Sequence, residues 1–418
     1  MTSARRAAAA LLSAVTDDGR TLDEALAAVP SYSELEGRDR AFARAIASAA
    51  LRRLGGVDRI LAAFITRPLP DQSKVARALL RTGAAQLLVL GGAPHAVVSE
   101  TVTLAQASRS ARAFSGLINA VLRKVAADGA ALFASLPPGA DLPDWLWTRW
   151  RAVYGDRADA IAVALGDEPP LDLSVRGDAA DWAAKLGGTV SRTGGVRLAP
   201  GARVTDLEGF AEGAWWVQDA AAALPAQLLG AVAGLRVLDA CAAPGGKTLQ
   251  LAAAGAQVTA LDASEPRLVR VRENLERMHL SAEVVCADAR TWRPVAPFDA
   301  VLLDAPCTAT GTLRRHPDAA WLRRPTDVPA LAQIQADLLA AARDLTRPGG
   351  AIVYAVCSLE PEEGEAILDT ARTLGLVLDP IRADEPTAAF ATASGALRTT
   401  PADDMDGFFA ARFIRSPH

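Results

Sequence analysis

The sequence predicts a multidomain protein in which an all-α domain, a small α+β subdomain and a Rossmann-like α/β domain follow one another. Three observations support this prediction. Apolar residues recur at three- and four-residue spacing through residues 4–127, which is typical of helices. Proline and glycine cluster between Gly129 and Pro143. From Leu235 onward, short apolar runs alternate with helical stretches. A chain of 418 residues is long enough for two or three domains.

The first domain, residues 1–135, is predicted to be helical throughout. No segment alternates with period two, and Pro68-Leu69-Pro70 and Gly91-Gly92-Ala93-Pro94 separate the periodic runs. These runs are Ala8–Val15, Ala41–Leu51, Val57–Ile65, Val75–Leu90, Val97–Leu104 and Phe114–Val125.

The second segment, residues 136–230, is predicted to be a linking subdomain of mixed structure. Leu171–Val175 and Gly195–Leu198 resemble short strands between glycine-rich turns. Trp145, Trp147 and Trp150 lie on one predicted helix. They could stack on nucleic-acid bases, but burial against a neighbouring element is the favoured interpretation.

The third segment, residues 231–418, has the pattern of a doubly wound α/β domain. Continuous apolar strands between helices indicate a parallel sheet covered on both faces, with ligands beyond the carboxyl ends of its strands. The predicted strands are Leu235–Asp239, Gln257–Asp262, Ala282–Asp288, Phe298–Asp304 and Gly350–Val356. The predicted helices between them are Lys247–Ala254, Pro266–His279 and Val328–Leu345.

Charge is unevenly distributed along the chain. Residues 1–130 contain 17 Lys and Arg against 11 Asp and Glu, a net charge of +6. The other 27 basic and 37 acidic residues give −10, so the total is −4. A basic first domain suggests an anionic partner such as nucleic acid, although a solvated helical surface gives the same count. We find no run of 18 uncharged apolar residues, so we expect no membrane span and a cytoplasmic protein.

The four cysteines form no C-x-x-C pair, and their spacing fits no zinc site, so we expect free thiols in a reducing compartment and no metal. Cys241, Cys307 and Cys357 follow predicted strands, where a ligand would bind. Cys286 lies inside a predicted strand and is expected to be core. A lone cysteine is usually a small apolar residue, but Cys307 and Cys357 stand on adjacent predicted strands beside Asp304. A thiol and a carboxylate next to a nucleoside cofactor suit attack on an electron-poor ring.

The loop after the first predicted strand reads Asp239-Ala-Cys-Ala-Ala-Pro-Gly-Gly-Lys247-Thr248. Gly246-Lys247-Thr248 matches the second half of a phosphate-binding P-loop, but Cys241 stands where that motif needs glycine. The competing hypothesis is a nucleoside cofactor. Asp262 would take its ribose hydroxyls and Asp288 would meet its adenine edge, each at the end of a predicted strand.

Three motifs resemble those of the RNA cytosine-5 methyltransferases of the RsmB/NOP/Sun group. They are Cys-Ala-Ala-Pro-Gly-Gly-Lys (241–247), Asp-Ala-Pro-Cys-Thr-Ala-Thr-Gly (304–311) and Val-Cys-Ser (356–358). Residues 313–324 and 331–335 resemble the RsmB branch, which modifies 16S ribosomal RNA. Residues 94–102 and 116–123 resemble the NusB-like RNA-binding domain of that branch. The resemblance spans nearly the whole chain and is weakest across 150–210.

The resemblance implies a class I methyltransferase domain that uses S-adenosyl-L-methionine to form 5-methylcytosine at cytosine 967 of 16S ribosomal RNA. It implies Cys357 as nucleophile, Cys307 as the residue that assists release, and Asp304 and Lys247 as further catalytic residues. Arginines 314, 315, 323 and 324 could hold the RNA backbone. The implied cofactor-binding residues are Cys241, Ala242, Ala243, Pro244, Gly245, Gly246, Lys247, Asp262, Arg267, Asp288 and Asp304.

The resemblance also leaves alternatives open. The family usually has threonine before the nucleophile, where this chain has Val356, and the lost hydroxyl could alter the polarity beside the thiol. The same chemistry on another RNA such as tRNA, a P-loop NTPase, and a non-catalytic RNA-binding protein are the other hypotheses. The intact thiols of Cys307 and Cys357 argue against the last of these. We expect 16S ribosomal RNA or a subunit assembly intermediate as partner, and a monomer.

Overall fold

The computed structural model describes residues 3–417, and the chain divides into two compact units. Unit 1 contains the chain up to Asp167 together with Leu313–Pro325, and unit 2 contains Glu168–Thr312 and the chain from Thr326 onward. This division differs from the three predicted ranges, because the helices of residues 144–165 belong to unit 1 and the small sheet belongs to unit 2.

Unit 1 is helical, as the apolar periodicity predicts. The side chain of Ser3 caps the first helix by accepting a hydrogen bond from the Arg6 N–H at 3.2 Å, and Thr21 and Glu24 form a capping box on the second. Alanine, leucine and valine from most of these helices form one core. The helices are α1 (Ala4–Thr16), α2 (Leu22–Ala28), α3 (Pro30–Ser33), α4 (Gly37–Arg52), α5 (Leu54–Phe64), α6 (Lys74–Leu88), α7 (Pro94–Ala107), α8 (Ser115–Lys124), α9 (Ala130–Ala134), α10 (Asp144–Tyr154), α11 (Arg157–Leu165) and α16 (Ala319–Leu322).

Helix α16 reaches unit 1 from far along the sequence. It lies in the segment Leu313–Pro325, which we expected within the third domain. The indole N–H of Trp321 donates to the Leu51 carbonyl at 2.9 Å, and Asp318 accepts from the Leu22 N–H at 3.0 Å. The chain therefore leaves unit 2 directly after Thr312, packs on α1, α2 and α4, and returns at Thr326.

Unit 2 begins with a small antiparallel sheet in the order β2-β3-β1-β4. Trp215 of β4 is fully buried in its core. The elements of this part are β1 (Leu171–Val175), α12 (Ala179–Leu186), β2 (Thr189–Val190), β3 (Val196–Leu198) and β4 (Trp215–Val217).

The second sheet of unit 2 has the order β10-β12-β9-β8-β5-β6-β7, with β11 paired to β12. Strands β5 to β9 run parallel, but β12 pairs antiparallel with β9, so the sheet is mixed and not wholly parallel as expected. The strands are β5 (Arg236–Ala240), β6 (Gln257–Asp262), β7 (Glu283–Cys286), β8 (Phe298–Asp304), β9 (Thr346–Val356), β10 (Leu376–Leu378), β11 (Leu397–Arg398) and β12 (Phe409–Arg415).

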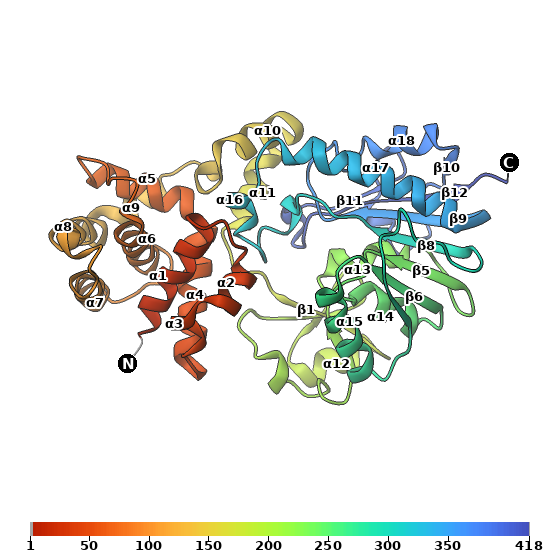
Figure 1. Cartoon of the computed structure of the whole chain (residues 1–418), viewed down its shortest axis with the longest axis horizontal. Helices are drawn as coiled ribbons and strands as arrows, with labels where there is room; N and C mark the ends of the chain where they lie inside the picture. The colour runs from red at the N-terminus through yellow and green to blue at the C-terminus, as the bar shows by residue number, and fades with distance from the viewer. Residues whose placement is uncertain (1–2, 418) are drawn as a thin grey trace. The chain divides into compact units, whose positions relative to one another are not determined.

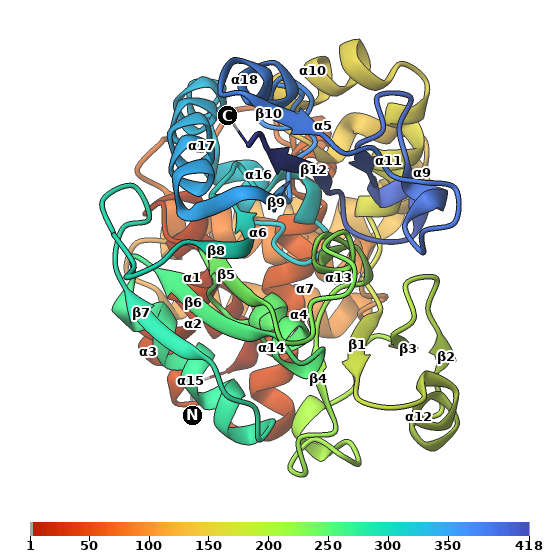
Figure 2. The same cartoon turned by 90° about the vertical axis from the view of Figure 1, so that its right-hand side faces the viewer.

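Helices cover both faces of this sheet, as Figures 1 and 2 show. Side chains of α13, α14 and α15 pack on one face, and those of α17 and α18 pack on the other. The chain continues from β5 to β6 on one side, while β8 lies on the other side of β5. The loops after β5 and β8 therefore diverge, and this switch point is where such sheets bind ligands. The helices are α13 (Ala220–Gln227), α14 (Gly246–Ala253), α15 (Glu265–Arg277), α17 (Asp327–Leu345) and α18 (Ile367–Thr373).

Two further expectations can be compared with the structure. Trp150 is fully buried, and Trp145 and Trp147 are half-buried, as expected for a helix packed on its neighbours. Over residues 3–417, none of the helices has both the length and the apolar character needed to span a bilayer.

Candidate active site

The loop between β5 and α14 turns tightly and contains residues with positive φ. Cys241 has a φ of 61° and Gly245 a φ of 104°, and the Ala243–Pro244 peptide bond is cis. The Gly245 N–H donates to the Ala242 carbonyl at 2.8 Å, which closes the turn before α14 begins. Small residues in such a turn let a ligand approach the backbone at the start of a helix.

Asp262, at the carboxyl end of β6, holds this loop in place. Its carboxylate accepts hydrogen bonds from the N–H groups of Ala243 at 3.2 Å and Ser264 at 2.9 Å. Arg267 bridges the same two elements, because its Nη1 lies 3.4 Å from Asp262 Oδ2 and its Nη2 donates to the Ala243 carbonyl at 2.6 Å. The structure therefore brings Asp262 and Arg267 to the loop that the sequence assigns to the cofactor.

Asp288 lies two residues beyond β7, on the same side of the sheet. It is half-buried, and its carboxylate accepts hydrogen bonds from the backbone and guanidinium of Arg290, with Nη2 to Oδ2 at 2.6 Å. These hydrogen bonds lower the pKa of Asp288 below its ordinary value. Arg290 was not singled out in the sequence because its role depends on this turn.

Lys247 and Asp304 form an ion pair beneath the switch point. The Lys247 Nζ donates to Asp304 Oδ2 at 2.7 Å and lies 5.3 Å from the centre of the Phe408 ring. Burial alone would lower the pKa of Lys247, but the carboxylates of Asp304 and Asp239 raise it above its ordinary value. Lys247 is therefore a buried cation. Phe408 was missed in the sequence, since only the fold brings it beside Lys247.

Asp239 is fully buried at the end of β5. Its Oδ2 accepts a hydrogen bond from the Thr248 hydroxyl at 2.5 Å, and its Oδ1 has no hydrogen-bond partner among the residues the structure describes. Burial raises the pKa of Asp239 to about 7, although the Thr248 hydrogen bond and the charge of Lys247 oppose the rise.

The thiols of Cys307 and Cys357 meet where the loops after β8 and β9 converge. Their Sγ atoms lie 3.4 Å apart. The Ala305 N–H donates to the Ala355 carbonyl at 2.9 Å, and the Gly311 N–H donates to the Cys357 carbonyl at 3.0 Å, so the two loops are joined along their backbones. Cys357 is half-buried and Cys307 is buried. The hydrogen bond with Cys357, burial and nearby anions raise the pKa of Cys307 well above its ordinary value.

The other two cysteines lie outside this pair. Burial raises the pKa of Cys241 to about 12, so its thiol stays neutral. Cys286 is exposed at the end of β7, and the expectation that it belongs to the core is wrong. β7 is a four-residue strand at the edge of the sheet, and Cys286 is its last residue. The apolar pattern of the sequence does not show that this strand lies at an edge.

Two expectations about single side chains also change. Val356, which replaces the usual threonine, is fully buried in the core between the sheet and α17, so its methyl groups pack inside and lie away from solvent. Arg314 is buried, which does not suit a residue expected to hold an RNA backbone, whereas Arg324 is exposed.

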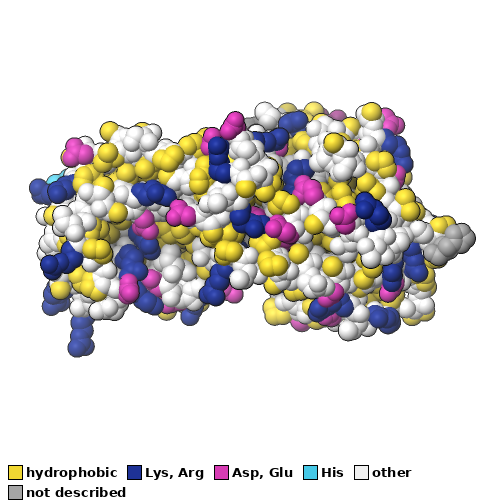
Figure 3. Space-filling model, turned by 90° about the horizontal axis from the view of Figure 1, so that it is seen from above, with side chains coloured by type: hydrophobic (Ala, Val, Ile, Leu, Met, Phe, Trp, Pro, Cys, Tyr) yellow, Lys and Arg dark blue, Asp and Glu magenta, His cyan; other side chains and the backbone are white. Residues whose placement is uncertain are grey.

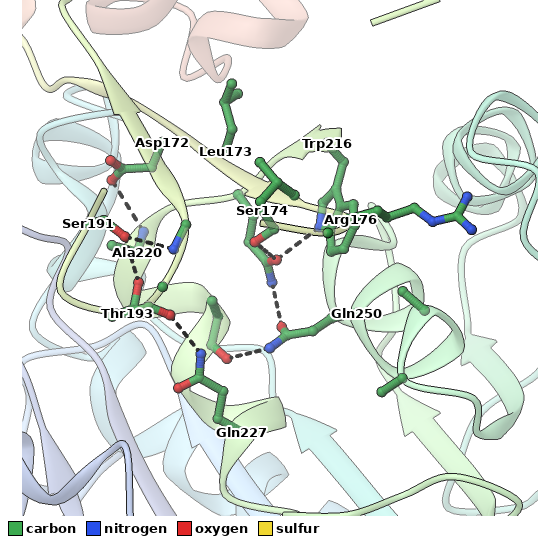
Figure 4. Close-up of a pocket in the computed structure, with 18 residues that line it drawn as sticks. Asp172, Leu173, Ser174, Arg176, Ser191, Thr193, Trp216, Ala220, Gln227 and Gln250 are labelled. Atoms are coloured by element: carbon green, nitrogen blue, oxygen red, sulfur yellow. Dashed lines mark hydrogen bonds between the residues drawn. The ribbon is translucent and has the colours of Figure 1, made fainter. Parts of the chain in front are cut away.

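A separate cavity of about 400 Å³ lies between the small sheet and helices α13 and α14 (Figure 4). Gln218 accepts hydrogen bonds from Ser174 at 2.7 Å and Trp216 at 2.9 Å, and donates to Gln250 at 3.2 Å. The polar side chains of this cavity thus bond largely to one another, and no predicted site residue lines it.

The residues at the switch point fit a nucleoside cofactor with a positive charge. Asp262 ends β6 and Asp288 follows β7, and Asp239 of β5 has a buried Oδ1 without a hydrogen-bond partner among the residues described. Carboxylates of this kind accept hydrogen bonds from ribose hydroxyls, whereas a triphosphate would meet repulsion from them.

Comparison with known proteins agrees with this geometry. A family model described as 16S rRNA methyltransferase RsmB/F matches residues 226–414, and the NusB family model matches residues 2–127. Ribosomal RNA small subunit methyltransferase B of Xanthomonas campestris is 39% identical, over 99% of this chain and 97% of its own length. The protein of the same name from Vibrio cholerae is 39% identical over 86% of each chain.

Solved structures agree on the fold. The crystal structure of PH0851 covers 98% of both chains with a TM-score of 0.76 at 22% identity. A methyltransferase homolog protein from Pyrococcus horikoshii is 27% identical, with a TM-score of 0.55 over 64% of this chain and 93% of its own. The predicted NusB-like and Rossmann-like domains are confirmed, and the P-loop NTPase is not favoured. The chain belongs to the RsmB family of S-adenosylmethionine-dependent ribosomal RNA methyltransferases.

Proposed function

We propose that this protein forms 5-methylcytosine in 16S ribosomal RNA, at cytosine 967, through a covalent adduct between Cys357 and carbon 6 of the base. The observation that carries this proposal is the pair of thiols 3.4 Å apart on the strands next to the Lys247–Asp304 ion pair. Carbon 5 of cytosine is a poor nucleophile, so the reaction needs a group that activates the ring.

Cys357 is the nucleophile in this proposal because it is the more accessible of the two thiols. Its thiolate adds to carbon 6, an S–C bond forms, and the electron pair of the 5,6 double bond moves onto the ring toward carbon 5 and N3. Lys247 lies close enough to Cys357 for the charge of the sulfur to raise the pKa of Lys247, so a cation stands beside the nucleophile. The Asp304–Lys247 pair then stabilises the charge at N3.

The cofactor lies against the β5–α14 loop in this proposal. Residues 241–247 would hold it, Asp262 would accept hydrogen bonds from its ribose, and Asp288 would hold its adenine. Arg267 keeps Asp262 and the loop together. When bound, S-adenosylmethionine supplies the methyl group that activated carbon 5 takes.

Release of the product needs two changes on the base. The proton on carbon 5 leaves to solvent, its electron pair restores the double bond, and the S–C6 bond breaks with its electrons returning to Cys357. We assign Cys307 to this step. Its raised pKa keeps it protonated, so it can donate a hydrogen bond to the departing thiolate 3.4 Å away.

Unit 1 holds the RNA in this proposal, because its family model is NusB and residues 1–130 carry a net charge of +6. On the face that Figure 3 shows, Lys and Arg side chains are spread among acidic ones. The target base must also turn out of the RNA to reach the thiols. The names of the relatives support ribosomal RNA over tRNA as substrate. We propose the cytoplasm as the place of the reaction.

Three enzyme forms test the proposal on a 16S RNA fragment with methyl-labelled cofactor. We expect wild type to label one cytosine, Cys357→Ser to label none, and Cys307→Ser to leave an RNA–protein adduct that survives a denaturing gel. Bisulfite sequencing locates the labelled base. An unlabelled 16S fragment beside labelled tRNA in a parallel assay would make tRNA the substrate. An adduct formed by Cys357→Ser would exchange the roles of the two thiols.

A further inference from the structure

We propose that Glu363 is a positioning residue that holds the two active-site thiols at their short mutual distance. It stands in the turn between β9 and α18, six residues after Cys357, and touches neither thiol in the hydrogen bonds that the structure shows. The inference rests on the proposed function, in which Cys357 attacks and Cys307 assists release.

The carboxylate of Glu363 is fully buried and receives four hydrogen bonds. Its Oε1 accepts from the Thr308 N–H at 2.9 Å and from Gln335 Nε2 at 3.1 Å. Its Oε2 accepts from the hydroxyls of Thr308 and Ser358. Burial raises the pKa of Glu363 above its ordinary value, and the hydrogen bonds from Ser358, Thr308 and Gln335 oppose this rise. Four donors on two oxygens suit the ionised carboxylate, which offers acceptors only.

These donors are the neighbours of the two thiols. Thr308 directly follows Cys307, and Ser358 directly follows Cys357. Gln335 also donates to the carbonyl of Pro306 at 2.9 Å, on the other side of Cys307. One carboxylate therefore joins both cysteine-bearing loops.

Glu363 is itself fixed by the sheet. The Tyr354 hydroxyl of β9 donates to the Glu363 carbonyl at 2.7 Å and lies 3.1 Å from Gln335 Oε1 of α17. Tyr354, Gln335 and Glu363 are all fully buried. A buried polar network gains little stability over a well-packed apolar core, so its placement across the two loops points to a functional role.

The charge of Glu363 acts in the same direction as its geometry. The hydrogen bond with Cys357 and burial are the main causes that raise the pKa of Cys307, and the anion of Glu363 adds to them. Glu363 thus keeps Cys307 protonated, as a donor to the departing thiolate.

The first test measures thiol proximity and needs no RNA. Diamide oxidises two neighbouring thiols to a disulfide and is itself reduced to the hydrazine, so the rate of Cys307–Cys357 disulfide formation, read from tryptic peptides by mass spectrometry, reports their positions. We expect Glu363→Ala to slow this rate at least tenfold. Glu363→Gln keeps the shape of the side chain but loses the charge that helps to raise the pKa of Cys307. The rise of its oxidation rate with pH should therefore begin at least half a pH unit lower than in wild type.

Asp369→Asn is the matched control. Asp369 lies on α18, is exposed and pairs with the exposed Arg372 at 2.9 Å. Its oxidation rate should stay within twofold of wild type. Cofactor binding, measured by thermal shift, should be unchanged in all three variants. This result would show that the variants fold.

The second test uses methyl transfer. In Glu363→Ala we expect kcat to fall 10- to 100-fold with the KM for RNA within threefold of wild type, and the fraction of enzyme held as RNA adduct to rise. A purely structural role would lower the amount of folded enzyme without changing the adduct fraction. If the two Glu363 variants oxidise and turn over like Asp369→Asn, or if both lose cofactor binding, the positioning role is overturned. A wild type that oxidises as expected but labels no cytosine contradicts the proposed function instead.

Discussion

Asp239 has a fully buried carboxyl group near the end of β5, two residues before Cys241 of the β5–α14 loop. One of its oxygens bonds to Thr248, and the other has no partner among the residues described. Burying a carboxylate costs free energy unless its lone pairs are satisfied, so the folded protein favours the neutral acid.

This residue makes stability depend on pH with a definite sign. The pKa of Asp239 is about 7 in the folded chain and close to 4 when unfolded. Between these values the unfolded state releases the proton first, so the free energy of unfolding falls as pH rises from about 4 to 7. Below pH 4 the carboxyl is protonated in both states, and this penalty vanishes.

Asp239→Asn should therefore gain stability relative to wild type as pH rises. We expect the difference in the free energy of unfolding to grow by on the order of 2–4 kcal/mol between pH 4.5 and 7.5, measured by urea denaturation. Asp299→Asn is the control of opposite sign, because hydrogen bonds from Arg236 and Arg347 lower the pKa of Asp299. Parallel curves for Asp239→Asn and wild type would show that Asp239 is ionised in the folded protein.

The site residues differ in how far sequence could predict them. Lys247, Asp262, Asp304, Cys307 and Cys357 stand at strand ends or in the loop after β5, so strand pattern and motif were enough to bring them together. Glu363, Phe408 and Arg290 were missed. Their contacts depend on a turn and on an antiparallel strand whose positions only the folded sheet determines.

Among the elements, the β5–α14 loop depends most clearly on one backbone angle. Gly245 has a φ of 104°, and an added Cβ would lie 3.4 Å from Val271, at ordinary contact distance. The conformation, and not the space, therefore requires glycine there. Gly255, just beyond the other end of α14, has a φ of 85° and similar room beside Ala233.

Gly245→Ala should weaken cofactor binding more than it weakens the fold. We expect each alanine substitution, at 245 and at 255, to cost about 1–3 kcal/mol of stability through backbone strain. Only Gly245→Ala should raise the Kd for S-adenosylmethionine, by tenfold or more, because only its turn faces the cofactor. Isothermal titration measures the Kd, and equal losses in both variants would mean that the loop is not the binding element.

The core strands β5, β6, β8 and β9 and helices α14, α15 and α17 were predicted to within a few residues, because each carries a continuous apolar pattern. The mixed character of the sheet was not predicted. No strand was predicted at β12, and local periodicity does not give the direction in which a strand pairs. The excursion of Leu313–Pro325 into unit 1 was missed for the same reason, since its anchor Trp321 finds its partner Leu51 far away in sequence.

On the scale of the whole molecule, chain passes between the two units at three places, after residues 167, 312 and 325. The second of these follows the Cys307 loop directly. The basic unit to which we assign the RNA and the unit that holds the thiols are therefore connected directly after the Cys307 loop.

The charge asymmetry predicts how RNA affinity divides between the units. Arg38 and Arg44 are exposed on α4 of unit 1, whereas Arg372 and Arg382 are exposed in unit 2 and pair with Asp369 and Asp379. Each phosphate contact adds about 0.7–0.9 to the slope of log affinity against log salt.

We expect Arg38→Ala/Arg44→Ala to weaken binding of a 16S RNA fragment at least tenfold and to reduce this slope by about 1–2, with kcat unchanged at saturating RNA. Arg372→Ala/Arg382→Ala should change neither the affinity nor the slope, because the carboxylates of Asp369 and Asp379 already balance these two positive charges. Filter binding between 50 and 200 mM KCl measures both quantities, and an equal loss in the two double variants would place the RNA on unit 2 as well.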